Sequence, residues 1–262
     1  MTLVNWSART AFAAALLFAS FVPTQAQTTS ERPLWDGMYV GLNLGYARGS
    51  SDASAIVPPT SLMNIAGRDT VAAVANGSFS DGAMLGGLTF GVARRTGQFV
   101  LGIEADLGAF AFDGKRDTGV VASGFNGRAV DSVSSDWLAT VRLRLGYAAA
   151  SSLFYLTTGP AFSNISISRN VDWSAADPCP TAELGLRRCH AGKDDLQAGW
   201  TIGGGLEHAL SQNWTIKAEY LYVDFGDAKF RTRNAAEPNQ QWIDHKIDLN
   251  MHIGRMGVNY RF

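Results

Sequence analysis

Apolar and polar side chains alternate along most of the chain after residue 34, and this period of two is typical of β-strands. In 38–46, the even positions hold Met, Val, Leu, Leu and Tyr, whereas the odd positions hold Tyr, Gly, Asn and Gly. The same alternation recurs in 99–107, 137–147, 200–206 and 214–222, and less regularly in 82–92 and 153–162. With a final segment at 247–262, the pattern predicts eight strands.

The final segment changes parity part-way along. Its apolar residues stand at odd positions from Ile247 to Ile253 and at even positions from Met256 to Phe262. One extra residue in a strand returns the following side chains to the other face. We therefore expect a β-bulge near Gly254 that gathers all of the apolar residues of this segment on one face.

The face opposite the apolar one decides between a soluble and a membrane barrel. It carries Gly, Thr, Asn and charged residues, whereas the apolar face is unbroken and ends in aromatic residues. A membrane barrel presents apolar side chains to lipid and polar ones to its lumen, and its strands need about 9–11 residues. The pattern predicts an all-β fold, an eight-stranded antiparallel transmembrane β-barrel.

The lengths of the connections support the same fold. The connections at 94–98, 148–152 and 211–213 are short. They alternate strictly with long ones at 49–80, 111–136, 164–196 and 227–246. A compact soluble domain rarely holds four long structureless loops, whereas outer-membrane barrels combine short periplasmic turns with long extracellular loops. A barrel also leaves no open sheet edge in hydrocarbon.

Aromatic residues gather at the expected strand ends, as in the two girdles of a membrane barrel. Those at the expected periplasmic ends are Trp35, Tyr39, Phe90, Phe99, Tyr147, Trp214, Tyr260 and Phe262. Those at the expected outer ends are Trp137, Trp200, Tyr222 and Phe225.

The first 26 residues resemble a secretory signal peptide. Arg9 precedes an apolar run at 11–22 that is shorter than the roughly 20 residues of a membrane-spanning helix. Thr24-Gln25-Ala26 is a small-x-small cleavage pattern. We expect residues 1–26 to be removed and 27–262 to form the barrel domain in the outer membrane; the alternative is an N-terminal anchor helix.

Composition narrows the function classes. The chain has 262 residues, 22 Lys and Arg against 23 Asp and Glu, and a net charge of −1. A nucleic-acid partner would favour a basic surface, so we expect none. Only two Cys are present, which excludes a disulfide-rich scaffold.

Several segments resemble a known family. Similarity to the outer-membrane immunogenic proteins, small porin-like barrels of alphaproteobacteria, is carried by Trp35–Tyr46, Leu101–Leu107, Thr140–Tyr147, Glu219–Asp224 and Gly257–Phe262. The resemblance covers nearly the whole mature chain, and it implies an eight-stranded barrel in the outer membrane. The Cys-bearing third loop and the long first loop depart from the family, so no loop-borne activity is carried over.

The C-terminus resembles an assembly signal. Val258, Tyr260 and Phe262 are apolar or aromatic residues spaced by two, with Phe at the end. This arrangement is similar to the signal that the barrel-assembly machinery recognises, which implies that machinery as a partner.

The predicted lumen carries a balanced set of charges. Its members are Glu104, Asp106, Arg142, Arg144, Glu207, Lys217, Glu219 and Arg255. An eight-stranded barrel is only wide enough for side chains, and buried charges are normally paired. Estimated registers place Glu207 opposite Lys217, Glu104 near Arg142 and Arg144, and Arg255 diagonal to Glu219. We predict an ion-paired plug; the alternative is a narrow porin-like channel lined by these charges.

Enzyme motifs are scarce. No His is followed two residues later by Ser, as in some lipid-modifying barrels, and no Gly-x-Ser-x-Gly occurs. Gly203-Gly204-Gly205 precedes no expected helix and so predicts no phosphate loop. Glu104 and Asp106 could serve acid–base chemistry, but nearby Arg residues favour ion pairing. We expect no enzyme, no cofactor and no metal.

Cys179 and Cys189 lie close together in the third long loop. In an exported protein, a loop disulfide is the leading interpretation, and it would stabilise the fold by about 2–3 kcal/mol in the chain-entropy model. The alternative is a metal site that includes His190. Two thiols and one imidazole leave a zinc site one ligand short.

The outer loops carry several cations: Arg187, Arg188, His190, Lys193, Lys229, Arg231 and Arg233. They are either ordinary solvated surface or contacts to lipopolysaccharide phosphates, which suit Arg forks. The sequence as a whole predicts a structural surface protein that contacts lipopolysaccharide and other surface or host partners.

Overall fold

The structure is a computed structural model that describes residues 34–262 except 60–75, 119–120, 124, 174–186 and 234–241. The signal peptide predicted at 1–26 lies outside the described residues. None of the described residues belongs to a helix long and apolar enough to cross a membrane.

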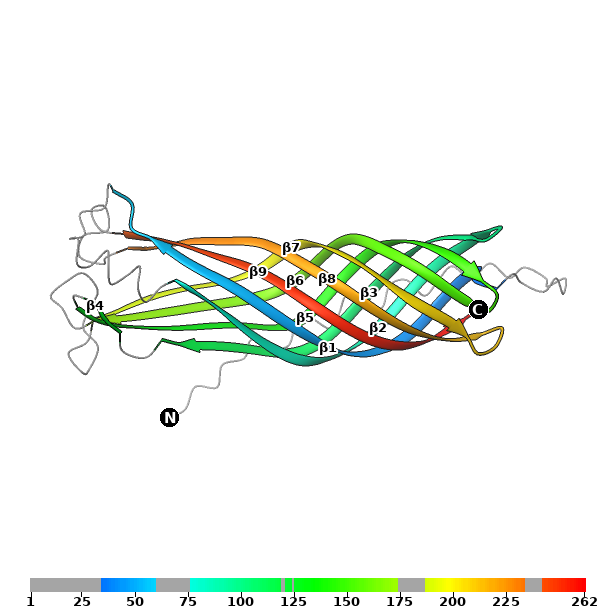
Figure 1. Ribbon diagram of the computed structural model, residues 1–262, viewed down its shortest axis with the longest axis horizontal. Coiled ribbons are helices and arrows are strands. Elements are labelled where there is room, and N and C mark those ends of the chain that lie inside the picture. The colour runs from blue at the N-terminus through cyan, green and yellow to red at the C-terminus, as the bar shows by residue number, and fades with distance from the viewer. Residues whose placement is uncertain (1–33, 60–75, 119–120, 124, 174–186, 234–241) are drawn as a thin grey trace, which may run out of the picture. The chain divides into compact units, whose positions relative to one another are not determined.

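The described chain consists of eight long strands and one short one (Figure 1). They are β1 Gly37–Ile56, β2 Gly77–Thr96, β3 Phe99–Asp117, β4 Val121–Ser123, β5 Phe125–Ala149, β6 Ser152–Trp173, β7 Arg187–Ala209, β8 Trp214–Arg233 and β9 Trp242–Arg261. The short strand β4 pairs only with the beginning of β5.

The eight long strands close on themselves. Neighbours along the chain pair antiparallel, β1 also pairs with β9, and β3 pairs with both β2 and β5. This circuit leaves none of the eight strands at an open edge, which satisfies the backbone in hydrocarbon. The eight-stranded antiparallel barrel predicted from the alternation is confirmed.

Three tight turns join strands at one end of the barrel. The turn between β2 and β3 places Gly97 at φ 62°, a left-handed conformation that Gly adopts without steric cost. In the turn before β8, the Leu210 amide donates to the Trp214 carbonyl at 2.8 Å. The Asn213 side-chain amide donates to the Arg261 carbonyl at 2.8 Å and ties this turn to the last strand.

The apolar face of the membrane segment points outward. Leu143, Ile202 and Ile216 are 59%, 49% and 40% exposed, whereas Arg142 and Glu219 are buried at 0% and 5%. A soluble barrel would have the reverse distribution. The inverted arrangement predicted from the sequence is therefore present in the structure.

The strands are longer than the alternation predicts. β1 continues to Ile56, β5 begins at Phe125 and β6 extends to Trp173, so much of the chain expected as loop is strand. In these extensions many interior side chains are apolar, such as Val133, Ile165 and Ile167, and most outward ones are polar, as in a soluble barrel. The sequence prediction missed them because it followed only the lipid-facing parity.

The bulge predicted near Gly254 is wrong. β9 pairs with β1 without interruption from Arg261 to Asp244, and all of its odd residues from Ile243 to Arg261 face inward. The apolar residues before Gly254 belong inside the barrel beyond the membrane, whereas those after it face lipid. Register shifts occur instead at Ala109/Phe112 in β3, Ser134/Leu138 in β5 and Asp224/Gly226 in β8.

The interior has three levels. At the end with the tight turns, an aromatic and apolar floor is formed by Trp35, Tyr39, Ala93, Val100, Ala148, Leu153 and Tyr155. Ionic side chains fill the middle. The outer level is an apolar core that includes Leu85, Phe110, Phe112, Val133, Ile165, Leu221, Phe225, Leu249 and Met251.

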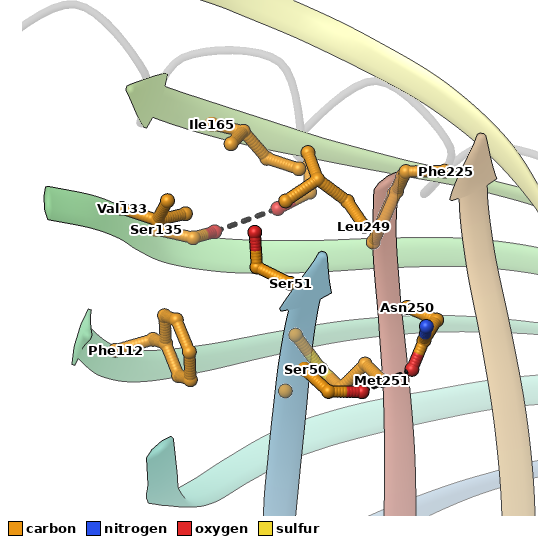
Figure 2. Close-up of a pocket in the computed structure, with 12 residues that line it drawn as sticks. Ser50, Ser51, Phe112, Val133, Ser135, Ile165, Phe225, Leu249, Asn250 and Met251 are labelled. Atoms are coloured by element: carbon orange, nitrogen blue, oxygen red, sulfur yellow. Dashed lines mark hydrogen bonds between the residues drawn. The ribbon is translucent and has the colours of Figure 1, made fainter. Parts of the chain in front are cut away.

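A small cavity of about 30 Å³ lies within the outer level (Figure 2). Its walls are mostly apolar, but serine side chains also line it, and the Ser135 and Ser163 hydroxyls lie 2.7 Å apart. Among the described residues, the buried Ser51 hydroxyl has no hydrogen-bond partner. Gly49 leaves room for the Phe112 ring, since a Cβ there would lie 2.9 Å from it. The cavity is about as large as two or three water molecules require.

Candidate functional site: the buried ion cluster

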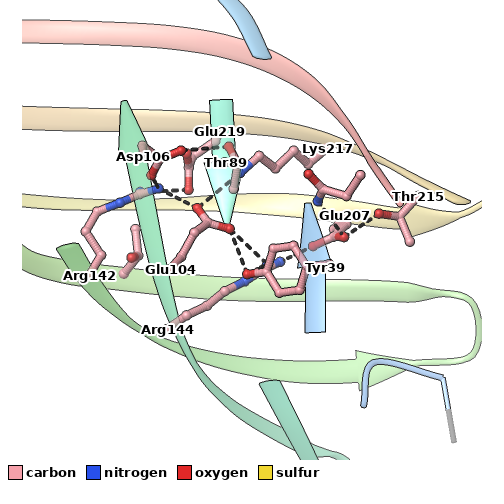
Figure 3. Close-up of polar contacts among 12 residues, drawn as sticks. Tyr39, Thr89, Glu104, Asp106, Arg142, Arg144, Glu207, Thr215, Lys217 and Glu219 are labelled. Atoms are coloured by element: carbon pink, nitrogen blue, oxygen red, sulfur yellow. Dashed lines mark hydrogen bonds and ion pairs between the residues drawn. The ribbon is translucent and has the colours of Figure 1, made fainter. Parts of the chain in front are cut away.

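Five strands contribute to the ion cluster in the middle of the barrel (Figure 3). β3 supplies Glu104 and Asp106, β5 supplies Arg142 and Arg144, β7 supplies Glu207, β8 supplies Lys217 and Glu219, and β9 supplies Arg255. All eight are buried, so the predicted lumen residues come together in one place. The formal charges of these eight residues, four carboxylates and four cations, cancel.

Arg142 lies at the centre of the cluster. Its Nη2 lies 2.5 Å from both Glu104 Oε1 and Asp106 Oδ2, and its Nη1 donates to Glu219 Oε1 at 3.0 Å. Glu104 is directly opposite in the β3–β5 ladder, whereas Glu219 is on β8 across the lumen. Arg142 therefore joins opposite walls of the barrel.

Arg144 connects the cluster to the floor. Its guanidinium forms an ion pair with Glu207, donates to the Tyr39 hydroxyl at 3.2 Å and lies 3.7 Å from the centre of the Tyr155 ring. The Tyr39 hydroxyl in turn donates to Glu104 Oε2 at 2.8 Å. These contacts orient the aromatic side chains of the floor beneath the charges.

Lys217 and Arg255 complete the ion pairs. Lys217 Nζ lies 3.0 Å from Glu104 Oε1, and Arg255 contacts Glu219 at 2.5 Å and Asp106 at 3.1 Å. Glu104 and Asp106 thus each contact more than one cation. Contact with several cations favours the ionised, hydrogen-bond-accepting form of these carboxylates. This arrangement favours ion pairing over the alternative of acid–base chemistry.

The predicted registers and the observed ion pairs differ in detail. Glu207 and Lys217 are cross-strand partners, as predicted, but the Lys217 amine reaches Glu104 instead. Arg255 lies directly opposite Glu219, not diagonal to it. Which charged side chains form ion pairs depends on their distances across the lumen. The registers of neighbouring strands do not specify these distances.

Sequence reasoning missed several polar members of the cluster. Glu207 also accepts hydrogen bonds from Thr215 at 2.5 Å and Asn259 at 3.0 Å, and Arg261 Nη2 lies 3.7 Å away. Thr89 donates to Asp106 at 2.7 Å. All of them share the inward parity of their strands, which is the signal that could have found them.

Three aromatic residues predicted in the girdles are inside the barrel instead. Trp35 and Tyr39 are buried in the floor, where the Arg261 guanidinium lies 5.6 Å and 4.9 Å from their ring centres. Phe225 keeps the inward-facing odd parity of Leu221 and Val223 on β8 and is buried in the outer apolar core. Outward aromatic residues such as Phe99, Trp200 and Trp214 remain exposed.

The cations of the outer rim are held by Asp residues. Arg231 donates to Asp244 through two nitrogens and lies 5.3 Å from the centre of the Trp242 ring. The hydrogen bond to Asp244 raises the pKa of Arg231. Lys229 and Lys246 both contact Asp227. These pairs favour the interpretation of the loop cations as ordinary surface.

Other predicted loop features lie outside the described part of the structure. The side chains of Arg187, Arg188, His190, Lys193 and Arg233 are not described. Cys179 lies in an undescribed segment, and Cys189 is known only as the backbone partner of Val171. The Cys179–Cys189 disulfide stays a prediction. No group of three or more His, Cys, Asp or Glu suited to a metal occurs among the described residues.

Asp248, on the outer part of β9, leads to a prediction about pH. Burial, followed by the nearby Asp224 and Asp227 charges, raises the pKa of Asp248. A raised pKa in the folded state means that stability falls as pH rises from the unfolded-state pKa through the folded-state one. We expect Asp248→Asn to raise the temperature of barrel unfolding slightly at pH 7.

Heat-modifiable gel mobility at pH 7 and at pH 3 measures this effect. The unfolding temperatures of wild type and Asp248→Asn should become equal at pH 3, because the Asp248 carboxyl is then protonated in the folded wild type. An equal difference at both pH values would contradict the electrostatic cause.

The sequence is similar to those of known outer-membrane proteins. Residues 12–262 match the family described as outer membrane protein beta-barrel domain. The chain belongs to this family. It is 32% identical to the 31 kDa outer-membrane immunogenic protein of Brucella melitensis over 96% of this chain and 95% of that protein. It is 26% identical to the 25 kDa outer-membrane immunogenic protein of Brucella canis, over 87% and 79%.

Solved structures of other outer-membrane proteins are similar to the barrel. OprG from Pseudomonas aeruginosa matches with a TM-score of 0.48 and 15% identity, over 87% of this chain and 97% of that one. Ail from Yersinia pestis matches with a TM-score of 0.35 and 12% identity, over 87% and 99%. Family and fold together place the protein in the outer membrane, as predicted. The resemblance to the immunogenic proteins is likewise confirmed.

Proposed function

We propose that this outer-membrane barrel is a non-conducting, non-enzymatic structural protein that contributes to envelope integrity and carries its outer loops to the cell surface. The observation that supports this most directly is the filled interior. Arg142 joins carboxylates from opposite walls, and Arg144 and Arg261 pack on the aromatic floor below it. An eight-stranded barrel leaves little space beyond such side chains.

The proposed partners are membrane components. The outward apolar band fits outer-membrane lipid, and lipopolysaccharide and other surface or host ligands are the proposed partners of the outer end of the barrel. The word immunogenic in the relatives' names supports surface exposure. Val258 and Tyr260 lie on the outward-facing parity of β9, and Phe262 directly follows this strand, which supports the proposed signal to the barrel-assembly machinery.

Planar-bilayer recording tests the proposal against the narrow-channel alternative. We expect the folded mature protein to show no large, stable single-channel steps, because ion pairs and aromatic side chains occupy the lumen. Folding is verified beforehand by heat-modifiable mobility. Reproducible large conductance from the folded protein would overturn the structural assignment and favour a porin. A changed membrane lipid structure after deletion of the protein, restored by its re-expression, would favour an enzyme.

A further inference from the structure

The outward face of the barrel changes character at one level of β1 and β9. On β1, the apolar residues Met38, Val40, Leu42, Leu44 and Tyr46 are followed by Arg48, Ser50 and Asp52. On β9, read toward the same end, Phe262, Tyr260, Val258 and Met256 are followed, after Gly254, by His252 and Asn250. Arg48 and His252 are cross-strand partners. They are the first polar side chains beyond the apolar band, the level of lipid headgroups.

Arg48 differs from the other described cations on the outer side of this level. The others each contact an Asp carboxylate: Lys115, Arg116, Arg128, Lys229, Arg231 and Lys246. Within the described residues, Arg48 has no ion pair, and its Nη2 donates only to the neutral Ser80 hydroxyl at 3.1 Å. Its side chain is exposed. A guanidinium at a lipid–water boundary thus keeps most of its donors for an external anion.

His252 adds a second donor at the same level. Its Nδ1 lies 2.5 Å from the Tyr220 hydroxyl. When that hydroxyl donates to Nδ1, the neutral imidazole carries its proton on Nε2 and donates from there. The Tyr222 ring lies 5.2 Å from the imidazole, and Trp200 contacts Tyr222 edge-on at 5.6 Å. An aromatic row therefore continues from the two donors across β8 to β7.

We propose that Arg48 and His252 bind a phosphate group of the glycolipid in the outer leaflet, with Tyr222 and Trp200 packing beside its sugar and acyl-chain boundary. This inference rests on the proposed structural role and names the lipid contact for it. A guanidinium fork suits phosphate, and Tyr and Trp favour the membrane interface. The contact lies on the barrel wall, not on the loop cations that Asp residues already hold.

Native mass spectrometry of the folded mature protein tests the contact, with bisphosphorylated lipid A as the probe. The variants are Arg48→Gln, His252→Gln and both together. Arg94→Gln is the matched control, because Arg94 is an exposed cation near the opposite end of β2. The comparison lipids are dephosphorylated lipid A and phosphatidylglycerol. All substitutions are on the surface, and heat-modifiable mobility verifies that each variant is folded.

We expect the double variant to bind lipid A roughly tenfold more weakly than wild type, the scale of a lost charge-assisted hydrogen bond. The Arg94→Gln control should bind like wild type, and wild type should prefer lipid A to both comparison lipids. Unchanged binding by the double variant, equal binding of dephosphorylated lipid A or of phosphatidylglycerol, or an equal loss in Arg94→Gln would each overturn the proposal. A conducting wild-type barrel would contradict the structural role. The ratio of lipid A binding between wild type and the double variant would still test the phosphate contact.

Discussion

Replacing Arg142 by Met is expected to destabilise the barrel by roughly 3–5 kcal/mol, the cost of removing one partner from a buried ion pair. The substitution leaves Glu104, Asp106 and Glu219 facing one another with only Lys217, Arg255 and more distant Arg144 contacts to offset their charge. Denaturant titration of the mature protein in detergent, followed by heat-modifiable mobility, measures the change.

Two further variants isolate the electrostatic cause. Arg94→Met removes an exposed cation from the barrel wall and should leave stability close to that of wild type. Adding Glu219→Gln to Arg142→Met removes one of the uncompensated carboxylates and should recover part of the loss. If Arg142→Met unfolds at the same denaturant concentration as wild type, the buried ion cluster does not stabilise the fold in the way described.

Removing the buried Arg144–Glu207 ion pair above the floor is expected to make a non-conducting barrel conduct ions. Arg144 and Glu207 contact each other and bridge the central charges to the floor. The double variant Arg144→Ala, Glu207→Ala deletes two long side chains from a lumen that they help to fill. It removes one charge of each sign, while Arg261 loses its contact with Glu207. Planar-bilayer recording should show resolved conductance steps where wild type shows none.

The matched control removes an ion pair from the outer surface. Lys246 and Asp227 contact each other at 2.9 Å on the outer rim, and Asp227→Ala with Lys246→Ala removes the pair without touching the lumen. This variant should remain as silent as wild type. Equal conductance in both double variants, or a folded Arg144→Ala, Glu207→Ala barrel without steps, would show that these side chains do not close the lumen.

The barrel was predictable because lipid selects side chains on one face of every membrane strand. Residues such as Leu143 and Ile202 have no other favourable place, and their parity marks the outward face. The same parity assigns Arg142 and Glu219 to the interior. Strand number and orientation follow from counting these segments and the short turns between them.

The wrong sequence predictions concern residues near the levels where the surroundings of the barrel change from lipid to water. Beyond Arg48 and His252 the outward face meets water and the interior becomes apolar, so Ile247–Ile253 seemed to need a bulge. Trp35 and Tyr39 are aromatic residues near a strand end, as girdle residues are, but their inward parity places them in the floor. In both cases parity was the better guide than residue type.

Local alternation and turn spacing were enough to establish the number of strands, their antiparallel order, the lipid-facing residues and the set of charges in the lumen. Each of these depends only on near neighbours along the chain or on the next strand. The partners of those charges depended on the closed barrel. Lys217 meets Glu104 and Arg142 meets Glu219 across the lumen, between strands that are not adjacent. Only the curvature of the whole sheet brings such atoms within reach, so the identity of each ion pair was decided by the tertiary structure.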